Sequence, residues 1–186
     1  MAKRRERLPL IPAEQLSPDQ KLAIDEMVAG PRGAVIGPFI ATLRSPELTR
    51  RLQRLGAYLR YDAALPEKLR EMAVLLTARE WTQGFEWETH SPLAAKAGLG
   101  AETIAAIAEA RLPGAMDRGE SLVYDVFTEL YRDRAVSDAT YESAVKEFGE
   151  QGVVDLITLI GYYTTLAMIL NVAQTEVLGP WAQGSA

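Results

Sequence analysis

The only histidine of the chain, His90, is the residue best suited to proton transfer. Glu86 lies four positions before it, so in a helix both side chains project from one face, one turn apart. A carboxylate within reach fixes the tautomer of an imidazole and prepares it to act as a general acid or base. Such pairs are also common on solvated helix surfaces. A closed pocket around His90 therefore favours catalysis, whereas an exposed His90 favours a surface pair.

Other chemistries lack the residues that they need. No cysteine is present, which excludes disulfides, thiolate metal sites, cysteine nucleophiles and dithiol redox cycles. The sequence holds neither a Gly-x-Ser-x-Gly turn nor a glycine-rich phosphate loop. Glu71, Glu86 and His90 could in principle bind a metal ion. Zinc and iron sites normally use more than one imidazole, so we expect no metal here.

Aromatic residues gather around the same stretch. Trp81, Phe85 and Trp87 could line a pocket for a flat organic substrate, or they could pack as core and interface anchors, which is the default interpretation. A buried phenol needs a hydrogen-bond partner in either role. Two tyrosine pairs share this ambiguity: Tyr58 with Tyr61, and Tyr162 with Tyr163.

The composition is that of an ordinary globular domain. The chain carries 20 basic and 25 acidic side chains, a formal net charge of −5, which argues against a nucleic-acid partner. Pro9 and Pro12 interrupt the apolar start of the chain, so we expect no signal peptide and a cytoplasmic protein. The apolar stretch 153–170 contains Asp155 and several threonines, which favours a buried core or interface helix over a membrane span.

Helical patterns run through nearly the whole chain, and the breaks between them carry helix-start signals such as Ser17-Pro18 and Ser45-Pro46. Pro92 predicts a kink, or a junction of two helical pieces, near His90. The sequence therefore predicts an all-α fold. Besides a short turn through residues 40–43, we expect about seven to eight helices, over 17–30, 45–59, 66–76, 85–97, 102–110, 120–132, 138–148 and 153–171.

We expect one domain over residues 1–186, with flexible ends at 1–12 and 179–186. A weak internal repeat suggests two related helical hairpins. Leu65-Pro66-Glu67 and Val136-Ser137-Asp138 each begin a predicted helix, and the spacing to the following Glu71 or Glu142 is the same. The second helical half spans about 120–172. The long apolar helix has more hydrophobic circumference than one small domain covers, which predicts association of the chain with copies of itself.

Three strings and their order resemble the carboxymuconolactone decarboxylase family, over a core of about residues 65–107. They are Leu69-Arg70-Glu71-Met72-Ala73, then Phe85-Glu86-Trp87-Glu88-Thr89-His90, then Ala94-Ala95-Lys96-Ala97-Gly98-Leu99. The resemblance implies a helical-hairpin core of the alkylhydroperoxidase D-like type, pseudo-repeated in this chain. It also implies a homo-oligomer, which is a dimer, trimer or hexamer.

Two chemistries occur in the family that the chain resembles. One branch reduces peroxides through a Cys-x-x-Cys pair, but the matching positions here hold Gln83 and Glu86, which form neither a thiolate nor a disulfide. The other branch removes carbon dioxide from a carboxylated muconolactone without metal or organic cofactor. Its Glu-Trp-x-x-His string is matched by Glu86, Trp87 and His90.

The resemblance to the second branch implies a cofactor-free lyase or isomerase that acts on a small lactone or carboxylate. His90 is then the acid/base, Glu86 orients it, Glu71 is a second carboxylate nearby, and Trp87 walls the pocket. The remaining candidates for contact with the substrate are Trp81, Gln83 and Phe85, with Arg70 or Arg79 binding its carboxylate. The alternative is a catalytically silent oligomer that binds a small ligand in the same pocket.

Overall fold

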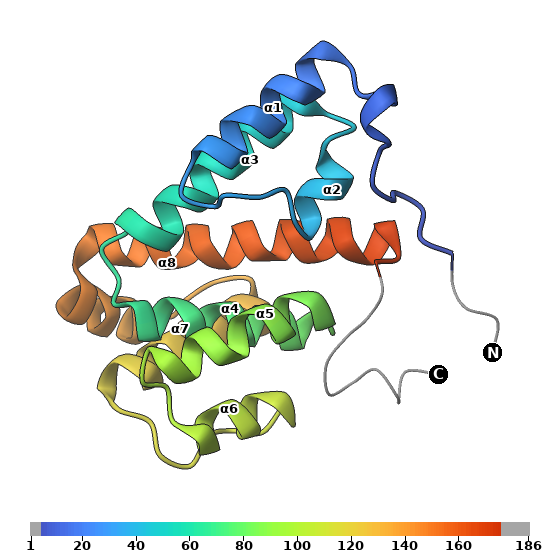
Figure 1. Cartoon of the computed structure of the whole chain (residues 1–186). Helices are drawn as coiled ribbons and strands as arrows, with labels where there is room; N and C mark the ends of the chain where they lie inside the picture. Colours follow the sequence, from blue (N-terminus) through green and yellow to red (C-terminus); the bar gives the residue numbers. More distant parts are fainter. Residues whose placement is uncertain (1–4, 176–186) are drawn as a thin grey trace.

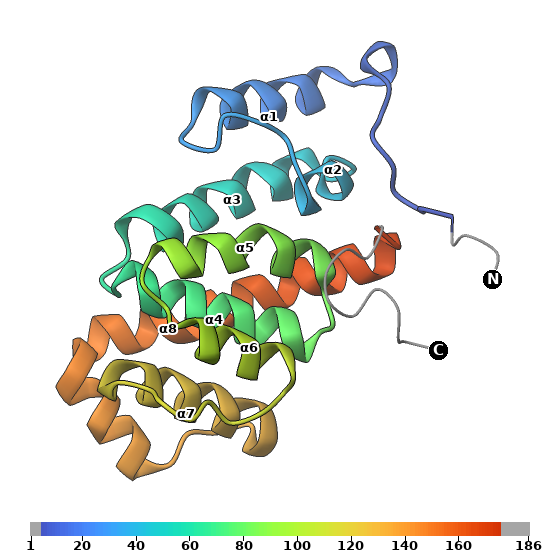
Figure 2. The ribbon, with the colours of Figure 1, turned by 60° about the horizontal axis from the view of Figure 1, so that its bottom comes forward.

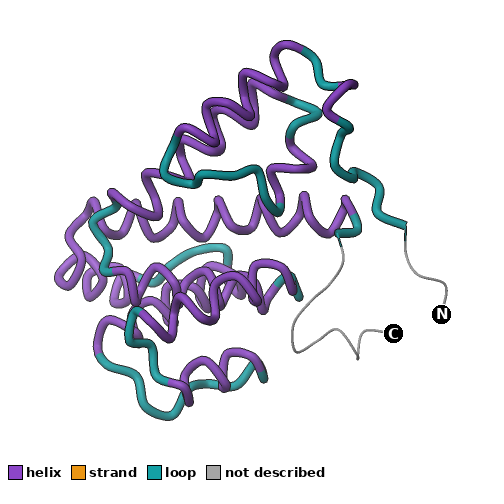
Figure 3. The backbone as a smooth tube through the Cα atoms, viewed as in Figure 1, coloured by secondary structure: helices purple, strands orange, loops and turns teal. Residues whose placement is uncertain are grey.

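A computed structural model describes residues 5–175, and within that range the fold is all helical with no strand (Figure 3). The all-α class and the expected number of helices are therefore confirmed. The eight α-helices of the described residues are α1 (Pro18–Ala29), α2 (Pro38–Thr42), α3 (Pro46–Ala57), α4 (Glu67–Glu80), α5 (Gly84–Lys96), α6 (Ala101–Ala108), α7 (Arg118–Asp133) and α8 (Asp138–Ala173). Two short turns complete the chain: η1, a 3-10 turn (Ala13–Gln15), and η2, a π-helical turn (Tyr58–Asp62).

The long helix α8 forms the central element of the molecule (Figure 1). Helices α1, α2 and α3 lie on one side of it, and α4, α5, α6 and α7 lie on the other. Figure 2 shows α4 and α5 side by side, between α3 and the α6–α7 pair. The main apolar core joins α4, α7 and α8 through buried residues such as Leu75, Val126 and Leu159.

Side chains at the helix starts explain why the helices begin where they do. Ser17 accepts a hydrogen bond from the backbone of Gln20, and the Gln20 side chain accepts one in return, as the sequence predicts. Asp117 and Glu120 form the same reciprocal cap at α7. The Ser137 hydroxyl caps α8 through the Thr140 amide. These local signals need no tertiary contact, which is why the sequence locates them well.

The leucines of the 45–59 segment recur at helical spacing, but only some of them are buried. Leu48 and Leu55 are 45% and 38% exposed, while the residues of α3 that face the core are Thr49, Gln53 and Gly56. The main neighbours of α3 are α1, α2 and the η2 turn, so its small and polar side packs largely within this group. Near its end the helix also approaches α8 closely, because a Cβ on Gly56 would lie 2.1 Å from the Tyr162 hydroxyl.

Helix α5 is a single element from Gly84 to Lys96 with Pro92 inside it, so the expected junction of two pieces near His90 does not occur. Pro92 lies on the exposed side. The break occurs in α8 instead, where Gly149 adopts φ 71° between the two pieces that the sequence predicts as separate helices. The two pieces of α8 meet at the single residue Gly149, whereas three residues connect α4 to α5. The second half of the chain therefore does not repeat the connection found between α4 and α5.

Residues 5–12 are not helical, yet they are held against the fold. The Arg7 amide donates to the Ala173 carbonyl at 2.7 Å, and the Arg44 guanidinium donates to the carbonyls of Leu8 and Pro9. Residues 1–4 and the expected flexible end at 179–186 lie outside the described residues.

Helix α8 is long and apolar enough to cross a membrane by length and composition alone. More than half of its most apolar stretch is buried inside the fold, however. Leu156, Leu159 and Leu170 have almost no exposed surface. This burial is what a core helix requires, as the sequence suggests for the 153–170 segment.

Candidate functional site

The candidate site centres on a contact between α4 and α5. His90 Nδ1 lies 2.6 Å from Glu71 Oε2, although the two residues are nineteen positions apart. His90 is 2% exposed and Glu71 is 6% exposed. A histidine and a carboxylate at this distance form a hydrogen bond, which fixes the orientation of the imidazole ring. The closed environment is the one that favours catalysis over a surface pair.

Glu86 flanks the other nitrogen of the same ring. Its Oε2 lies 3.5 Å from His90 Nε2, one turn earlier on α5, and Glu86 is 4% exposed. The spacing predicted this proximity. The sequence predicts that Glu86 orients the imidazole, with Glu71 as a second carboxylate nearby. In the structure, however, the shorter contact to the imidazole comes from Glu71. The reason is that α4 packs directly against α5 and aims Glu71 at Nδ1, whereas Glu86 reaches His90 only along its own helix.

The electrostatics of Glu86 differ from those of a surface carboxylate. Burial raises the pKa of Glu86, while the nearby His90, Arg32 and Arg60 oppose that rise. Its Oε1 atom has no hydrogen-bond partner among the described residues. A buried carboxyl of this kind favours the protonated form and has an oxygen available for a ligand or a proton transfer.

A cavity of about 30 Å³ lies beside this group of side chains. Its walls come from five parts of the chain, which are the loop between α1 and α2, α2 itself, the η2 turn, α5 and α8. The residues that line it are Arg32, Ile36, Pro38, Phe39, Arg60, Phe85, Glu86, Thr89, His90, Tyr162, Tyr163 and Leu166.

Two tyrosines from α8 close the inner wall. The Tyr163 ring meets the His90 ring edge-on, with the centroids 5.1 Å apart, and Tyr162 packs against Tyr163 in the same manner. Burial raises the pKa of Tyr162 to about 12 and raises the pKa of Tyr163 well above its ordinary value, so both phenols are neutral near pH 7. The sequence marked this pair as ambiguous between core and site, and the structure places both side chains at the cavity.

Three of the expected substrate contacts do not line the cavity. Trp87 is buried in the apolar core, and the Trp81 Nε1 donates to the Tyr131 hydroxyl at 3.0 Å. Gln83 accepts a hydrogen bond from the Phe85 amide and donates to Asn171 Oδ1 at 2.7 Å, so it ties the start of α5 to α8. Only Phe85 of the four faces the cavity. The default core interpretation therefore fits both tryptophans.

The two arginines suggested for a substrate carboxylate also lie elsewhere. Arg70 donates to the carbonyls of Leu65 at 2.5 Å and Ala63 at 3.3 Å, so it braces the chain before α4. Arg79 lines a different hollow. The cationic residues at the cavity are instead Arg32 and Arg60, which sequence reasoning missed. No local motif marks them, because they approach His90 only after distant segments have packed together.

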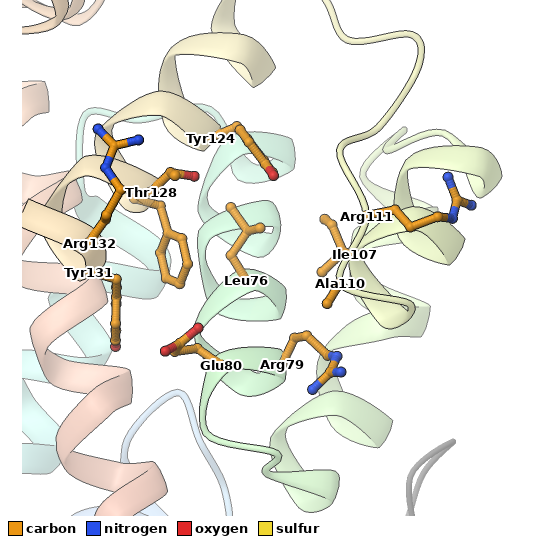
Figure 4. Close-up of a pocket in the computed structure, with 11 residues that line it drawn as sticks. Leu76, Arg79, Glu80, Ile107, Ala110, Arg111, Tyr124, Thr128, Tyr131 and Arg132 are labelled. Carbon is orange, nitrogen blue, oxygen red and sulfur yellow. The ribbon is translucent and has the colours of Figure 1, made fainter.

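The hollow that contains Arg79 has a volume of about 340 Å³ and lies between α4, α6 and α7 (Figure 4). Leu76 and Ile107 form part of its apolar floor. The heads of Arg111 and Arg132 point away from its centre in Figure 4 and pair with Glu109 and Asp133. It does not include His90 or either of its carboxylates.

The arrangement around His90 supports proton transfer better than metal binding. Within residues 5–175 no three or more His, Cys, Asp or Glu side chains are arranged to hold a metal ion. Both ring nitrogens of His90 face carboxylates, which leaves neither nitrogen directed at a common metal position. A buried imidazole between two carboxyl groups can take up and return a proton without exposure to bulk water.

Comparison with known proteins extends the resemblance seen in the sequence. The model of the carboxymuconolactone decarboxylase family matches residues 46–122, from the start of α3 into α7. The matched segment contains Glu71, Glu86 and His90, whereas Arg32 and the Tyr162–Tyr163 pair lie outside it. No curated protein matches the chain.

Proposed function

Because the chain belongs, through residues 46–122, to the carboxymuconolactone decarboxylase family, we propose that it is a cofactor-independent lyase or isomerase acting on a small lactone or oxo-acid. His90 is the general acid/base of this reaction. The observation that carries the proposal is the buried Glu71–His90–Glu86 group at the wall of a cavity. A structural role alone does not require three ionisable side chains in one desolvated place.

The chemistry that suits this group is decarboxylation of a lactone acid. The bond between the ring carbon and the carboxylate breaks, and its electron pair enters an extended enolate that includes the lactone carbonyl. A proton from His90 then reaches carbon, and solvent returns a proton to the imidazole. The enolate needs electrostatic stabilisation, which the positive charges of Arg32 and Arg60 at the same cavity can supply.

Each neighbour of His90 has a part in this proposal. Glu71 holds Nδ1 and stabilises the positive charge on the ring when His90 is protonated. Glu86 stands beside Nε2 and can pass a proton between the ring and the cavity. The Tyr163 ring excludes water from one side of the imidazole. Peroxide reduction of the kind that uses a Cys-x-x-Cys pair has no nucleophile in this chain.

The proposal includes a cytoplasmic homo-oligomer that has neither a nucleic-acid partner nor a membrane partner. Its support is the acidic composition and the apolar surface of α8, where Val154 and Val172 are each 61% exposed. The alternative, a silent small-ligand-binding oligomer, uses the same cavity and differs only in turnover.

The test is release of carbon dioxide from a carboxymuconolactone and from related lactone acids by wild-type protein stripped of metal ions. We expect turnover of at least one of these compounds, at a rate that added chelator does not change. Absence of turnover across the series would contradict the lyase proposal and favour the silent binding protein. Turnover that is lost on chelation and restored by metal would contradict the cofactor-independent mechanism.

A further inference from the structure

Two arginines border the cavity without an ion-pair partner among residues 5–175. Arg32 belongs to the loop between α1 and α2, and its guanidinium lies 4.4 Å from the centre of the Phe39 ring. Arg60 belongs to the η2 turn and lies 5.5 Å from the centre of the Tyr61 ring. Each head therefore lies against an aromatic face, and Arg32 also interacts with the Tyr162 hydroxyl. The remaining N–H groups of the two guanidinium groups can donate to an anion.

The same cavity holds two buried oxygen atoms with unused hydrogen-bonding capacity. Glu86 Oε1 makes no hydrogen bond within the described part of the chain, and the Tyr162 hydroxyl makes none beyond its interaction with the Arg32 guanidinium. Leaving such atoms unsatisfied in a desolvated place is unfavourable, so a ligand that pairs with them gains affinity. The raised pKa values of both groups favour their protonated forms, in which each has an O–H to donate. Two cations and two neutral donors form a setting suited to an anion.

We propose that Arg32 and Arg60 bind the carboxylate of the substrate, with the Tyr162 hydroxyl and the Glu86 carboxyl as additional donors. This inference rests on the function proposed above and specifies its substrate class, which is a small molecule that keeps a carboxylate while it reacts. Arg32 and Tyr162 lie outside the family-matched segment, so the family resemblance does not supply this site.

The size of the cavity limits how the carboxylate enters. At about 30 Å³ it accommodates a group the size of a water molecule, roughly a tenth of the volume of a typical ligand pocket. One oxygen of a carboxylate therefore fits between the arginines as the cavity stands. The ring of a lactone acid needs a displacement of the Arg32 loop, which ends at Gly37 against the Phe85 ring.

Binding of cyclopentanecarboxylate, a five-membered-ring acid that lacks the lactone, tests the inference separately from catalysis. We expect the wild-type protein to bind this probe in a calorimetric or NMR titration, and to bind neutral cyclopentanecarboxamide at least tenfold more weakly. Arg32→Gln and Arg60→Gln should each weaken carboxylate binding at least tenfold. Arg32→Lys and Arg60→Lys should retain part of it, because the charge remains. Arg132→Gln, on the surface, is the matched control and should bind as wild type does.

Equal affinity in wild type, Arg32→Gln and Arg60→Gln would overturn the inference, as would absence of binding to folded wild type. Circular dichroism and thermal melts establish that each variant is folded. The two proposals fail separately. Arginine-dependent binding without turnover of any lactone acid leaves the carboxylate site standing and removes the lyase. Turnover whose KM is unchanged in Arg32→Gln and Arg60→Gln leaves the lyase standing and removes the carboxylate site.

Discussion

At the scale of single residues, Glu86 makes the clearest prediction about stability. Its pKa is raised by burial, so folding takes up a proton once the pH exceeds the ordinary value of 4.5. The stabilising effect of the protonated carboxyl is complete below that pH and is lost as the pH rises through the raised pKa. We therefore expect Glu86→Gln to gain stability relative to wild type as the pH rises from 4 to 8, by an amount on the order of 1 kcal/mol or more, because the amide does not ionise.

Denaturant unfolding of both proteins across this pH range measures the difference directly. Glu88→Gln is the matched control, because Glu88 lies on the same helix but is exposed, so its replacement should change the free energy of unfolding little. A Glu86→Gln difference that stays constant across the range would show that Glu86 ionises normally in the folded protein.

The spacing of residues in the sequence predicts only part of the Glu71–His90–Glu86 group, namely the proximity of Glu86 and His90. The interval between Glu86 and His90 is fixed by the helix itself, so it is readable from the sequence. The contact between Glu71 and His90 depends on how α4 meets α5, and only the family resemblance pointed to it. Arg32 and Arg60 left no local signal, because their place at the cavity depends on the packing of segments far apart in the chain.

At the scale of elements, Asp155 holds the η2 turn against α8. Its carboxylate is buried and accepts hydrogen bonds from the Tyr58 hydroxyl and the Ala64 amide, both at 3.0 Å. Asp155→Asn replaces one of the two accepting oxygens by an NH2 group and removes the negative charge, so at least one of the two donors loses its acceptor, and we expect a loss of about 1–3 kcal/mol in the free energy of unfolding. Chemical denaturation measures this change. Asp25→Asn, on the exposed side of α1, should change stability little. Equal losses in the two variants would contradict the role of Asp155.

The loop that carries Arg32 depends on Gly37 for its path. Gly37 has φ 56°, and a Cβ there would lie 2.3 Å from the Phe85 ring. Gly33, in the same loop, has φ 70° with open space around it. Gly33→Ala should cost about 1–2 kcal/mol through backbone strain alone, and Gly37→Ala should cost more because the Phe85 ring must also move. Urea denaturation of the two variants compares the costs, and a smaller loss for Gly37→Ala would contradict this packing.

At the scale of the whole molecule, an apolar stripe on α8 favours self-association. Val154, Ile157, Met168 and Val172 are between 41% and 61% exposed and recur at helical spacing. We expect light scattering to give a mass that is a multiple of 20.4 kDa. Val154→Lys should lower that mass. Leu112→Lys, at a residue 65% exposed and away from α8, should leave it unchanged. A monomeric wild type would contradict the expected homo-oligomer.

The global arrangement was only partly readable from the sequence. Caps and periodicity located the helices, since those signals are local. The sequence did not indicate that α3 turns its Gly56 side toward α8, or that the loop between α1 and α2 reaches the site beside His90. Both features depend on contacts between residues far apart in the chain, which no periodicity encodes.

The most direct test of the proposed chemistry is a kinetic comparison of wild type with His90→Gln on the lactone acid that the wild type converts. His90→Gln should lower kcat by about 10²–10⁴ with little change in KM, because general acid–base catalysis contributes on that order. Glu88→Gln, two residues earlier on α5 and exposed, should retain the wild-type kcat. A folded His90→Gln protein with undiminished kcat would contradict the assignment of His90 as the acid/base.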